Sequence, residues 1–157
     1  MTLKELLVSA TLIGSTMPNV AYPQTTPVLE EISPDIINID GSNIDNVLDA
    51  QYAVIMYTVE GCEPCETVYD ILKNVARKTY DQNITPANIV FGIVDLTTDF
   101  DYWEHFTNSP VNSFPTVSFL DHGRELPDTR ISGLSDRSGY TERRIANTVT
   151  ELVAQLD

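Results

Sequence analysis

The sequence predicts an α/β domain in which helices flank a central mixed β-sheet. Two continuous apolar runs, residues 53–57 and 89–94, have the character of strands that are covered on both faces. A helical pattern lies between them, and this order predicts a parallel pair joined by a right-handed crossover. Residues 116–120 alternate, a tight turn follows at 121–123, and a return strand within 124–132 adds antiparallel pairing.

The chain divides into an N-terminal segment, residues 1–34, and a predicted domain, residues 35–157. The apolar stretch from Leu6 to Gly14 is too short to span a bilayer. Followed by Pro18 and Ala21, it predicts a signal peptide, while its helical leucine spacing favours an ordinary N-terminal helix as the alternative. Residues 22–34 are a predicted linker. Export to the periplasm, the ER lumen or the exterior is favoured, and a cytoplasmic location is the alternative.

The domain begins with a short predicted strand at residues 36–39, which ends at Asp40 and Gly41. Ser42 or Asn43 then caps a short helix, since both residue types are preferred at the N-cap position. The apolar face of this helix comprises Ile44, Val47 and Leu48.

The remaining helices are predicted from apolar residues at helical spacing. A long helix follows Gly61, and a polar loop at residues 79–88 connects it to the second buried strand. Thr98 is predicted to cap a helix that closes at residues 108–110. The apolar stripes of the three helices are, in chain order, Cys65, Val68, Leu72, Val75 and Ala76; Phe100, Trp103 and Phe106; and Ile145, Val149, Leu152, Val153 and Leu156.

Composition and charge limit the functions that this chain can have. Its 157 residues are 42% hydrophobic, and a domain of this size needs no disulfide or metal ion simply to stay folded. Its 23 acidic and 9 basic residues give a net charge of −14, which repels nucleic acid and anionic lipid. The sequence therefore excludes a nucleic-acid partner. The acidic excess either aids solubility or selects basic partners.

The motif with chemical content is Cys62-Glu63-Pro64-Cys65, at the junction of a buried strand and a helix. Two intervening residues bring both sulfurs within disulfide reach and leave the first one exposed. The unpaired N–H groups and positive dipole at a helix N-terminus favour a thiolate, so Cys62 is the predicted nucleophile. Cys65 is predicted to resolve the mixed disulfide. Pro64 is tolerated in the first helical turn, where a missing N–H donor leaves no hydrogen bond unmade.

Two other roles compete for this cysteine pair. A zinc site lacks ligands, because there is no second cysteine pair and His105 and His122 do not form a recognised metal spacing. A purely structural disulfide stays open, although closing so short a loop constrains the unfolded chain little. No metal and no organic cofactor is predicted, since a cysteine pair itself carries two electrons.

The segment 35–157 resembles thioredoxin. The resemblance rests on the C-x-x-C motif, the order of elements, and Ser113-Phe114-Pro115-Thr116 entering an antiparallel strand about fifty residues later. It implies that Pro115 is cis and lies beside the cysteines, and that the backbone of Phe114 binds the substrate chain by strand addition. It also implies a thiol–disulfide oxidoreductase whose substrates are protein thiols or disulfides and which a redox partner recycles.

Some residues depart from the thioredoxin pattern. Gly61 stands where the family has tryptophan, and Met56 stands where it has a buried acid. Glu60, Glu63 and Glu66 lie close to Cys62 in sequence, and nearby negative charge disfavours a thiolate. The helix terminus contributes only about 0.3–1 kcal/mol, less than the ~1.4 kcal/mol of one pKa unit. The sequence therefore predicts that Cys62 is not strongly acidified and that the protein is no powerful oxidant.

A second resemblance supplies the alternative function. Residues 54–58, the longer loop after the helix, and residues 91–95 are similar to the lumenal thioredoxin-like subunit of oligosaccharyltransferase. This resemblance implies a module that holds acceptor proteins through transient mixed disulfides, although the membrane helices of that family are absent here. The alternative is therefore a thioredoxin-fold client-binding module, or a lumenal subunit of that type, without redox turnover. Asn83-Ile84-Thr85 fits a glycosylation acceptor triplet.

Overall fold

The computed structural model describes residues 35–133 and 139–156. In these residues, six strands form one mixed sheet with the order β1-β3-β2-β4-β5, and β6 also pairs with β4. The strands are β1 (Ile37–Asn38), β2 (Tyr52–Thr58), β3 (Ile89–Asp95), β4 (Thr116–Asp121), β5 (Arg124–Glu125) and β6 (Ile131–Ser132). The predicted signal peptide, alternative helix and linker of residues 1–34 lie outside the described residues.

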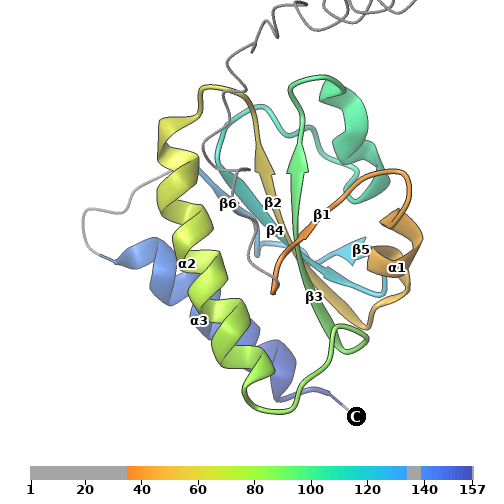
Figure 1. The fold of residues 1–157 in the computed structure, drawn as a ribbon, viewed down its shortest axis with the longest axis vertical. Helices are drawn as coiled ribbons and strands as arrows, with labels where there is room; N and C mark the ends of the chain where they lie inside the picture. Colours follow the sequence, from red (N-terminus) through yellow and green to blue (C-terminus); the bar gives the residue numbers. More distant parts are fainter. Residues whose placement is uncertain (1–34, 134–138, 157) are drawn as a thin grey trace, which may run out of the picture.

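Helices cover both faces of this sheet (Figure 1). The helical elements are α1 (Ile44–Asp49), α2 (Glu63–Tyr80), the 3-10 helix η2 (Phe100–His105) and α3 (Tyr140–Val153). One core cluster joins Met56 of β2 to residues of α2 and α3, and the other joins Tyr57 to residues of α1 and η2. The predicted α/β architecture, a mixed sheet between two layers of helices, is confirmed.

The register of the central strands determines where the site lies. β2 runs parallel to β3, with Thr58 opposite Asp95, and antiparallel to β4, with Tyr57 opposite Thr116. The parallel pair predicted from the two apolar runs is thus confirmed. Because β4 runs the other way, its first residue lies at the same edge of the sheet as the last residues of β2 and β3. Figure 1 shows these strand ends together with the start of α2 and with η2.

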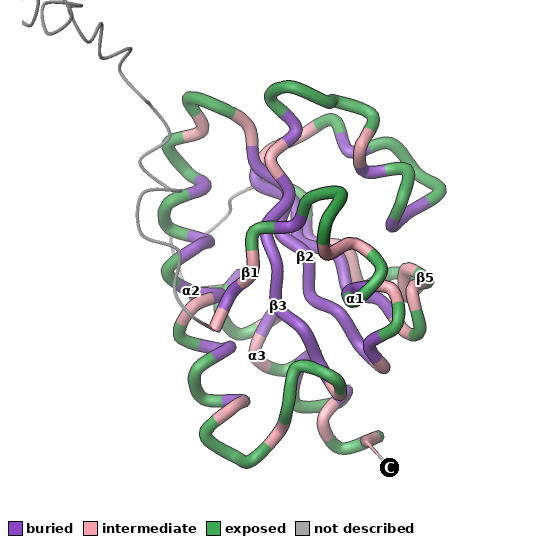
Figure 2. The backbone as a smooth tube through the Cα atoms, turned by 45° about the vertical axis from the view of Figure 1, so that its right-hand side comes forward, coloured by how far each residue is buried: buried purple, intermediate pink, exposed green. Residues whose placement is uncertain are grey.

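The central strands are buried on both faces, as Figure 2 shows. Every residue of β2 is buried, as are the first six residues of β3. The alternation of residues 116–120 does not mark an exposed face, because Thr116 and Ser118 are 1% and 0% exposed. Their hydroxyls are satisfied internally: Thr116 Oγ1 donates to the carbonyl of Ser113 at 2.7 Å, and Ser118 Oγ lies 3.0 Å from the hydroxyl of Tyr57.

Several predicted boundaries differ from the structure. α2 continues through Thr79 and Tyr80, since the hydroxyl of Thr79 returns its hydrogen bond to the carbonyl of Val75 in the same helix. Asn43 occupies the N-cap of α1, but its side chain makes no cap bond and instead accepts from the backbone N–H of Asp40. The return strand predicted after the turn is interrupted, because β5 and β6 each pair with only two residues of β4.

The helix predicted to begin at Thr98 is the 3-10 helix η2, and its N-cap residue is Asp99. Its three-residue repeat continues to Phe106, whose N–H bonds to the carbonyl of Trp103. Trp103 and Phe106 are buried, as the apolar stripe predicts, but Phe100 is 51% exposed. The stripe predicted along this segment is therefore wrong at its first residue.

None of the described helices combines the length and the apolar character that crossing a bilayer requires. Among the same residues, no group of three or more His, Cys, Asp or Glu side chains is arranged to hold a metal ion.

Candidate active site

The two cysteines lie at the first turn of α2. Cys62 is the N-cap residue, and the backbone N–H of Cys65 donates to its carbonyl at 3.2 Å. Pro64 lies within the first two positions of the helix, where a donor is not needed. This turn brings the two Cα atoms to 5.4 Å, and the cysteines form a disulfide. The C-x-x-C spacing thus allows the disulfide to form within the first turn of an otherwise regular helix.

The two sulfur-bearing residues differ in burial. Cys65 is 0% exposed and belongs to the core cluster that also contains Met56. Cys62 is partly exposed and packs against the edge of the same cluster. A partner in solution can therefore contact Cys62. The buried Cys65 contacts only neighbouring protein atoms, including the sulfur of Cys62.

The loop before Cys62 is held against the end of β3. The N–H of Glu60 donates to Thr97 Oγ1 at 2.7 Å, and the N–H of Leu96 donates to the carbonyl of Thr58 at 2.8 Å. Gly61 has a φ of +75°, which glycine adopts without the steric penalty of other residues. The position that carries tryptophan in thioredoxin is therefore a turn position here that favours glycine.

The predicted substrate-binding residues lie at the same edge of the sheet. The peptide bond between Phe114 and Pro115 is cis, and β4 begins at the next residue, Thr116. Thr116 pairs with Tyr57, so the preceding residue, Pro115, lies beside the end of β2. β2 ends at Thr58, four residues before Cys62 in the chain. The carbonyl of Pro115 accepts a hydrogen bond from Gly133 at 2.9 Å.

The acidic side chains near the cysteines in sequence lie at the surface, and none is buried beneath them. Glu60, Glu63 and Glu66 are all exposed, so water screens their effect on the Cys62 sulfur. Met56 is fully buried beneath the site. The buried polar side chains of the described residues are Thr58, Thr79, Thr107, Thr116, Ser118 and Thr141. In this part of the chain, therefore, no carboxylate is buried beneath Cys65 to take its proton.

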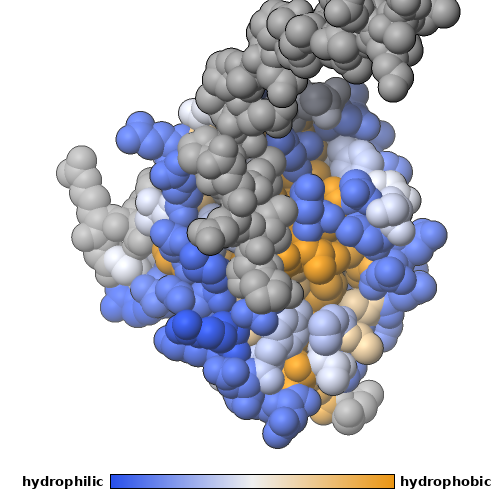
Figure 3. Space-filling model, viewed as in Figure 1, coloured by the Kyte–Doolittle hydropathy of each residue, from blue (hydrophilic) through white to orange (hydrophobic). Residues whose placement is uncertain are grey.

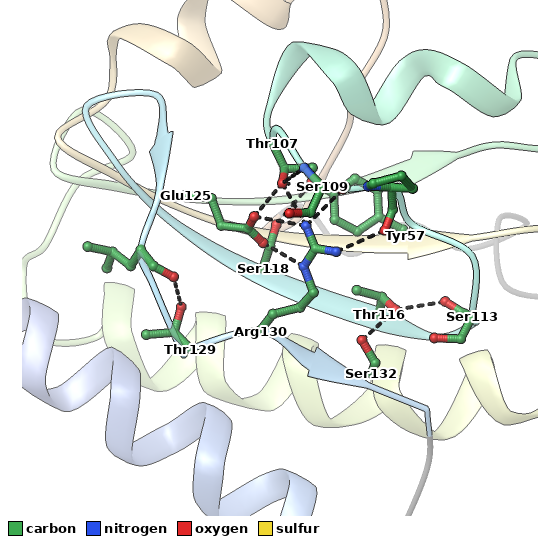
Figure 4. Close-up of polar contacts among 12 residues, drawn as sticks. Tyr57, Thr107, Ser109, Ser113, Thr116, Ser118, Glu125, Thr129, Arg130 and Ser132 are labelled. Carbon is green, nitrogen blue, oxygen red and sulfur yellow. Dashed lines mark hydrogen bonds and ion pairs between the residues drawn. The ribbon is translucent and has the colours of Figure 1, made fainter.

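A polar cluster that the sequence did not reveal holds the segment before the cis peptide bond (Figure 4). Arg130 donates from Nε and Nη2 to the two carboxylate oxygens of Glu125, at 2.7 and 2.8 Å. The same guanidinium bonds Thr107 Oγ1 at 2.6 Å and the carbonyl of Pro110 at 3.0 Å. The hydrogen bonds to Glu125 raise the pKa of Arg130 above its ordinary value. This cluster fixes the backbone a few residues before Phe114.

Two further contacts at the site escape the sequence for different reasons. Thr97, which anchors the loop before Cys62, is 35 residues from Cys62 in the chain and carries no motif. Phe100 contacts Phe114 edge to face, with ring centroids 6.1 Å apart. Its signal in the sequence is the pair of acidic residues on either side of it, Asp99 and Asp101, which is atypical of a buried aromatic residue.

Comparison of the sequence with known proteins gives no relative: no protein-family model matches, and no curated protein matches. Comparison of the structure does. The zinc-bound form of human ERp44 superposes with a TM-score of 0.59 at 17% identity, covering 74% of this chain and 30% of that chain. This chain thus spans less than a third of the ERp44 chain that it matches.

Two thioredoxins match over most of their own length. A point-mutant thioredoxin of Halobacterium salinarum has a TM-score of 0.55 at 16% identity, covering 78% of this chain and 95% of that chain. Thioredoxin O2 of Arabidopsis thaliana in its oxidised state has a TM-score of 0.55 at 16% identity, covering 75% and 94%. These likenesses show that the chain has a thioredoxin-like fold and confirm that resemblance. The resemblance to the oligosaccharyltransferase subunit stays a prediction.

Proposed function

We propose that this protein is a thiol–disulfide oxidoreductase that acts on the cysteines of other proteins. The observation that carries the proposal is the asymmetric cysteine pair at the start of α2, with Cys62 partly exposed and Cys65 fully buried. An attacking sulfur must be reachable, and a resolving sulfur must meet only its neighbour. The thioredoxin-like fold supports the proposal as well.

In the reducing direction, the Cys62 thiolate attacks one sulfur of a client disulfide. A mixed disulfide forms, and the other client sulfur leaves as a thiolate, which takes a proton from water. Cys65 then gives its proton to water and attacks the sulfur of Cys62. The bond between Cys62 and the client breaks, the client leaves as a second thiol, and the Cys62–Cys65 disulfide forms. Two electrons pass from the protein to the client, and the reverse sequence oxidises a client dithiol.

Four more residues have proposed roles in this reaction. The backbone of Phe114 pairs with the client chain as an added strand, and Pro115 keeps that segment from pairing elsewhere, because it has no N–H. Glu63 and Pro64 modulate the pair: Glu63 adds negative charge next to Cys62, which opposes thiolate formation, and Pro64 constrains the turn between the two sulfurs.

The balance of charges supports a reductant or isomerase rather than a strong oxidant. The N-terminus of α2 stabilises a Cys62 thiolate by about 0.3–1 kcal/mol. The three exposed glutamates, Glu60, Glu63 and Glu66, act in the opposite direction and are screened by water, so neither effect is large enough to acidify Cys62 strongly. Equilibrating the protein with a series of glutathione ratios measures the resulting reduction potential.

Trapping the mixed disulfide tests the proposal. Reduced Cys65→Ser protein is incubated with a disulfide-linked peptide dimer, and mass spectrometry identifies what is bound at Cys62. A mixed disulfide should accumulate in Cys65→Ser, because the resolving sulfur is missing. In the wild type it should form only transiently. Cys62→Ser is the matched control and should form little adduct, since Cys65 is 0% exposed.

Two results would contradict this mechanism. Equal adduct formation in the two single variants would mean that attack is not specific to Cys62. Retention of the peptide by the double variant Cys62→Ser/Cys65→Ser would instead favour the client-binding module without redox turnover.

The partner that recycles the cysteine pair is proposed only by its chemistry, as a donor or acceptor of two electrons through a thiol or disulfide. Export of the chain stays a prediction, because the segment on which it rests, residues 1–34, lies outside the described residues.

A further inference from the structure

We propose that Phe100 and Phe114 form an aromatic surface beside Cys62, and that the acidic rim of this surface selects client segments that combine an apolar side chain with Lys or Arg. This inference rests on the proposed oxidoreductase function and adds to it the class of client.

Phe100 is unusual among the large apolar residues that the structure describes. It is 51% exposed, whereas Trp103 and Phe106 of the same segment are 9% and 2% exposed. A single exposed aromatic residue is ordinary by itself. What distinguishes Phe100 is its edge-to-face contact with Phe114, at 6.1 Å between ring centroids. Phe114 in turn is the residue that precedes the cis peptide bond.

The fold places this aromatic pair at the same edge of the sheet as Cys62. Phe114 packs against the core cluster that Cys62 also contacts. η2 begins five residues after the end of β3, and the hydrogen bond from Glu60 to Thr97 ties that segment to the loop before Cys62. No atom lies within 4 Å of the point where a side chain would begin on Gly61. The loop before Cys62 therefore has no side chain at position 61. The aromatic surface comes instead from Phe100 and Phe114.

The two chain segments that form this surface contribute acidic side chains and no Lys or Arg side chain. Residues 59–72 and 95–119, which carry the cysteines, η2 and the cis peptide bond, contain no Lys or Arg. Exposed acidic residues in the two segments include Glu60, Glu63, Glu66, Asp99, Asp101 and Glu104. A surface with negative electrostatic potential attracts a cationic peptide and repels an anionic one, and salt weakens both effects.

A client that fits both features has an aromatic or large aliphatic side chain next to its cysteine and basic residues nearby. The apolar side chain would cover the exposed part of Phe100, and the basic residues would lie over Asp99 and Asp101. Aromatic pairs contribute about 0.5–1.5 kcal/mol beyond their buried area. By the same constants, removing the Phe100 ring changes the reaction rate of such a client by about 2- to 10-fold.

The experiment measures the rate at which the reduced protein reacts with four peptide disulfide dimers. The peptides carry either Phe or Ser beside the cysteine, and either Lys or Glu at the flanking positions. The wild type should react fastest with the Phe–Lys peptide and slowest with the Ser–Glu peptide. Raising NaCl from 0.05 to 0.5 M should bring the Lys and Glu peptides closer together.

Matched variants separate the two features. Phe100→Ser should slow the Phe peptides and leave the Ser peptides unchanged. Tyr140→Ser is its control, because Tyr140 is also exposed, at 47%, but begins α3 on the other face of the sheet. Asp99→Asn/Asp101→Asn should reduce the preference for Lys over Glu, and Glu142→Gln/Glu151→Gln on α3 should not.

The outcomes distinguish this inference from the function on which it rests. Equal rates for all four peptides, unchanged by Phe100→Ser, would overturn the inference and leave the oxidoreductase intact. Failure of the wild type to exchange with any peptide, or with hydroxyethyl disulfide, would overturn the proposed function itself.

Discussion

At the scale of single residues, burial raises the pKa of several tyrosines, among them Tyr57 and the half-buried Tyr80. The hydroxyl of Tyr80 donates to the carbonyl of Ile89 at 3.1 Å, and burial raises the pKa of Tyr80 to about 12. Tyr57 of β2 is fully buried with its hydroxyl 3.0 Å from Ser118 Oγ, and burial raises its pKa further above the ordinary value. Both side chains are therefore held neutral by the fold.

This predicts how Tyr80 responds to alkaline pH. The folded pKa lies above the unfolded value near 10, so the contribution of Tyr80 to stability is complete below pH 10 and is lost as the pH rises toward 12. An absorbance titration of phenolate should show one fewer late-titrating group in Tyr80→Phe than in the wild type. An unchanged number of late-titrating groups in Tyr80→Phe would contradict the prediction.

The residues of the site differ in how far the sequence alone reveals them. Cys62 and Cys65 are predicted from their spacing, and Phe114 and Pro115 from the resemblance to thioredoxin. Arg130 and Thr107 are not found, because 23 positions separate them and only the completed fold brings them together. Phe100 is predicted within an apolar stripe, since periodicity alone does not show which side of a 3-10 turn faces the core.

At the scale of elements, β3 depends on a glycine. Gly92 lies between Ile37 of β1 and Ile55 of β2 in the register. A Cβ atom at this position would lie 2.7 Å from Cγ1 of Ile39, whose own side chain is 5% exposed. The side chain of Ile39 therefore fills the space that any larger residue at position 92 would need.

Gly92→Ala is accordingly expected to lower the free energy of unfolding by about 1–3 kcal/mol, as overpacking does in other cores. Urea denaturation followed by circular dichroism measures this change. Gly41→Ala is the control, because no atom lies within 4 Å of its Cβ position, and it should change stability by no more than about 0.5 kcal/mol. Equal effects of the two substitutions would show that Ile39 adapts without cost.

The elements that the sequence predicts well are those whose burial is uniform. β2 and β3 are found because a continuous apolar run is typical of a strand covered on both faces. β4 is found, but its polar residues mislead the prediction of its exposure, since Thr116 and Ser118 satisfy their hydroxyls within the fold. Apolar spacing alone does not distinguish the 3-10 type of η2 from an α-helix. The break between β5 and β6 lies where Leu126 donates its N–H to the carbonyl of Phe119, a long-range bond that local patterns do not contain.

At the scale of the whole molecule, the net charge of −14 acts on stability as well as on partners. In Figure 3, hydrophilic residues extend along α2 and around the margin of this face, and hydrophobic ones gather nearer its centre. Like charges spread over a compact surface repel one another, and this repulsion is weaker in the expanded unfolded chain.

Salt should therefore stabilise the fold at neutral pH. Raising NaCl from 0.02 to 0.5 M shortens the screening length to a few ångströms, and each 1 kcal/mol gained raises the Tm by about 4 °C in a domain of this size. Differential scanning calorimetry measures the shift. At pH 5, nearer the isoelectric point of about 4.2, the same salt step should have a smaller effect. A Tm that falls with NaCl at pH 7 would mean that attractive ion pairs outweigh the repulsion.

The overall fold was predictable because the order of elements leaves few arrangements. A buried strand, a long helix and a second buried strand require a crossover, and a hairpin at the other side of the first strand completes a mixed sheet. The N-terminal segment, residues 1–34, shows the limit of this reasoning, since a signal peptide and an amphipathic helix share one apolar pattern.

The pairing of Tyr57 with Thr116 has a mechanical consequence. The two halves of the site, fifty residues apart in the chain, are carried by neighbouring central strands that have no exposed face. Separating Cys62 from the Phe114–Pro115 segment would mean breaking the middle of the sheet, which in most proteins opens only when the whole domain does. The fold therefore fixes the position of the Phe114–Pro115 segment relative to Cys62, and a chain that binds to both has to adapt its own conformation to them.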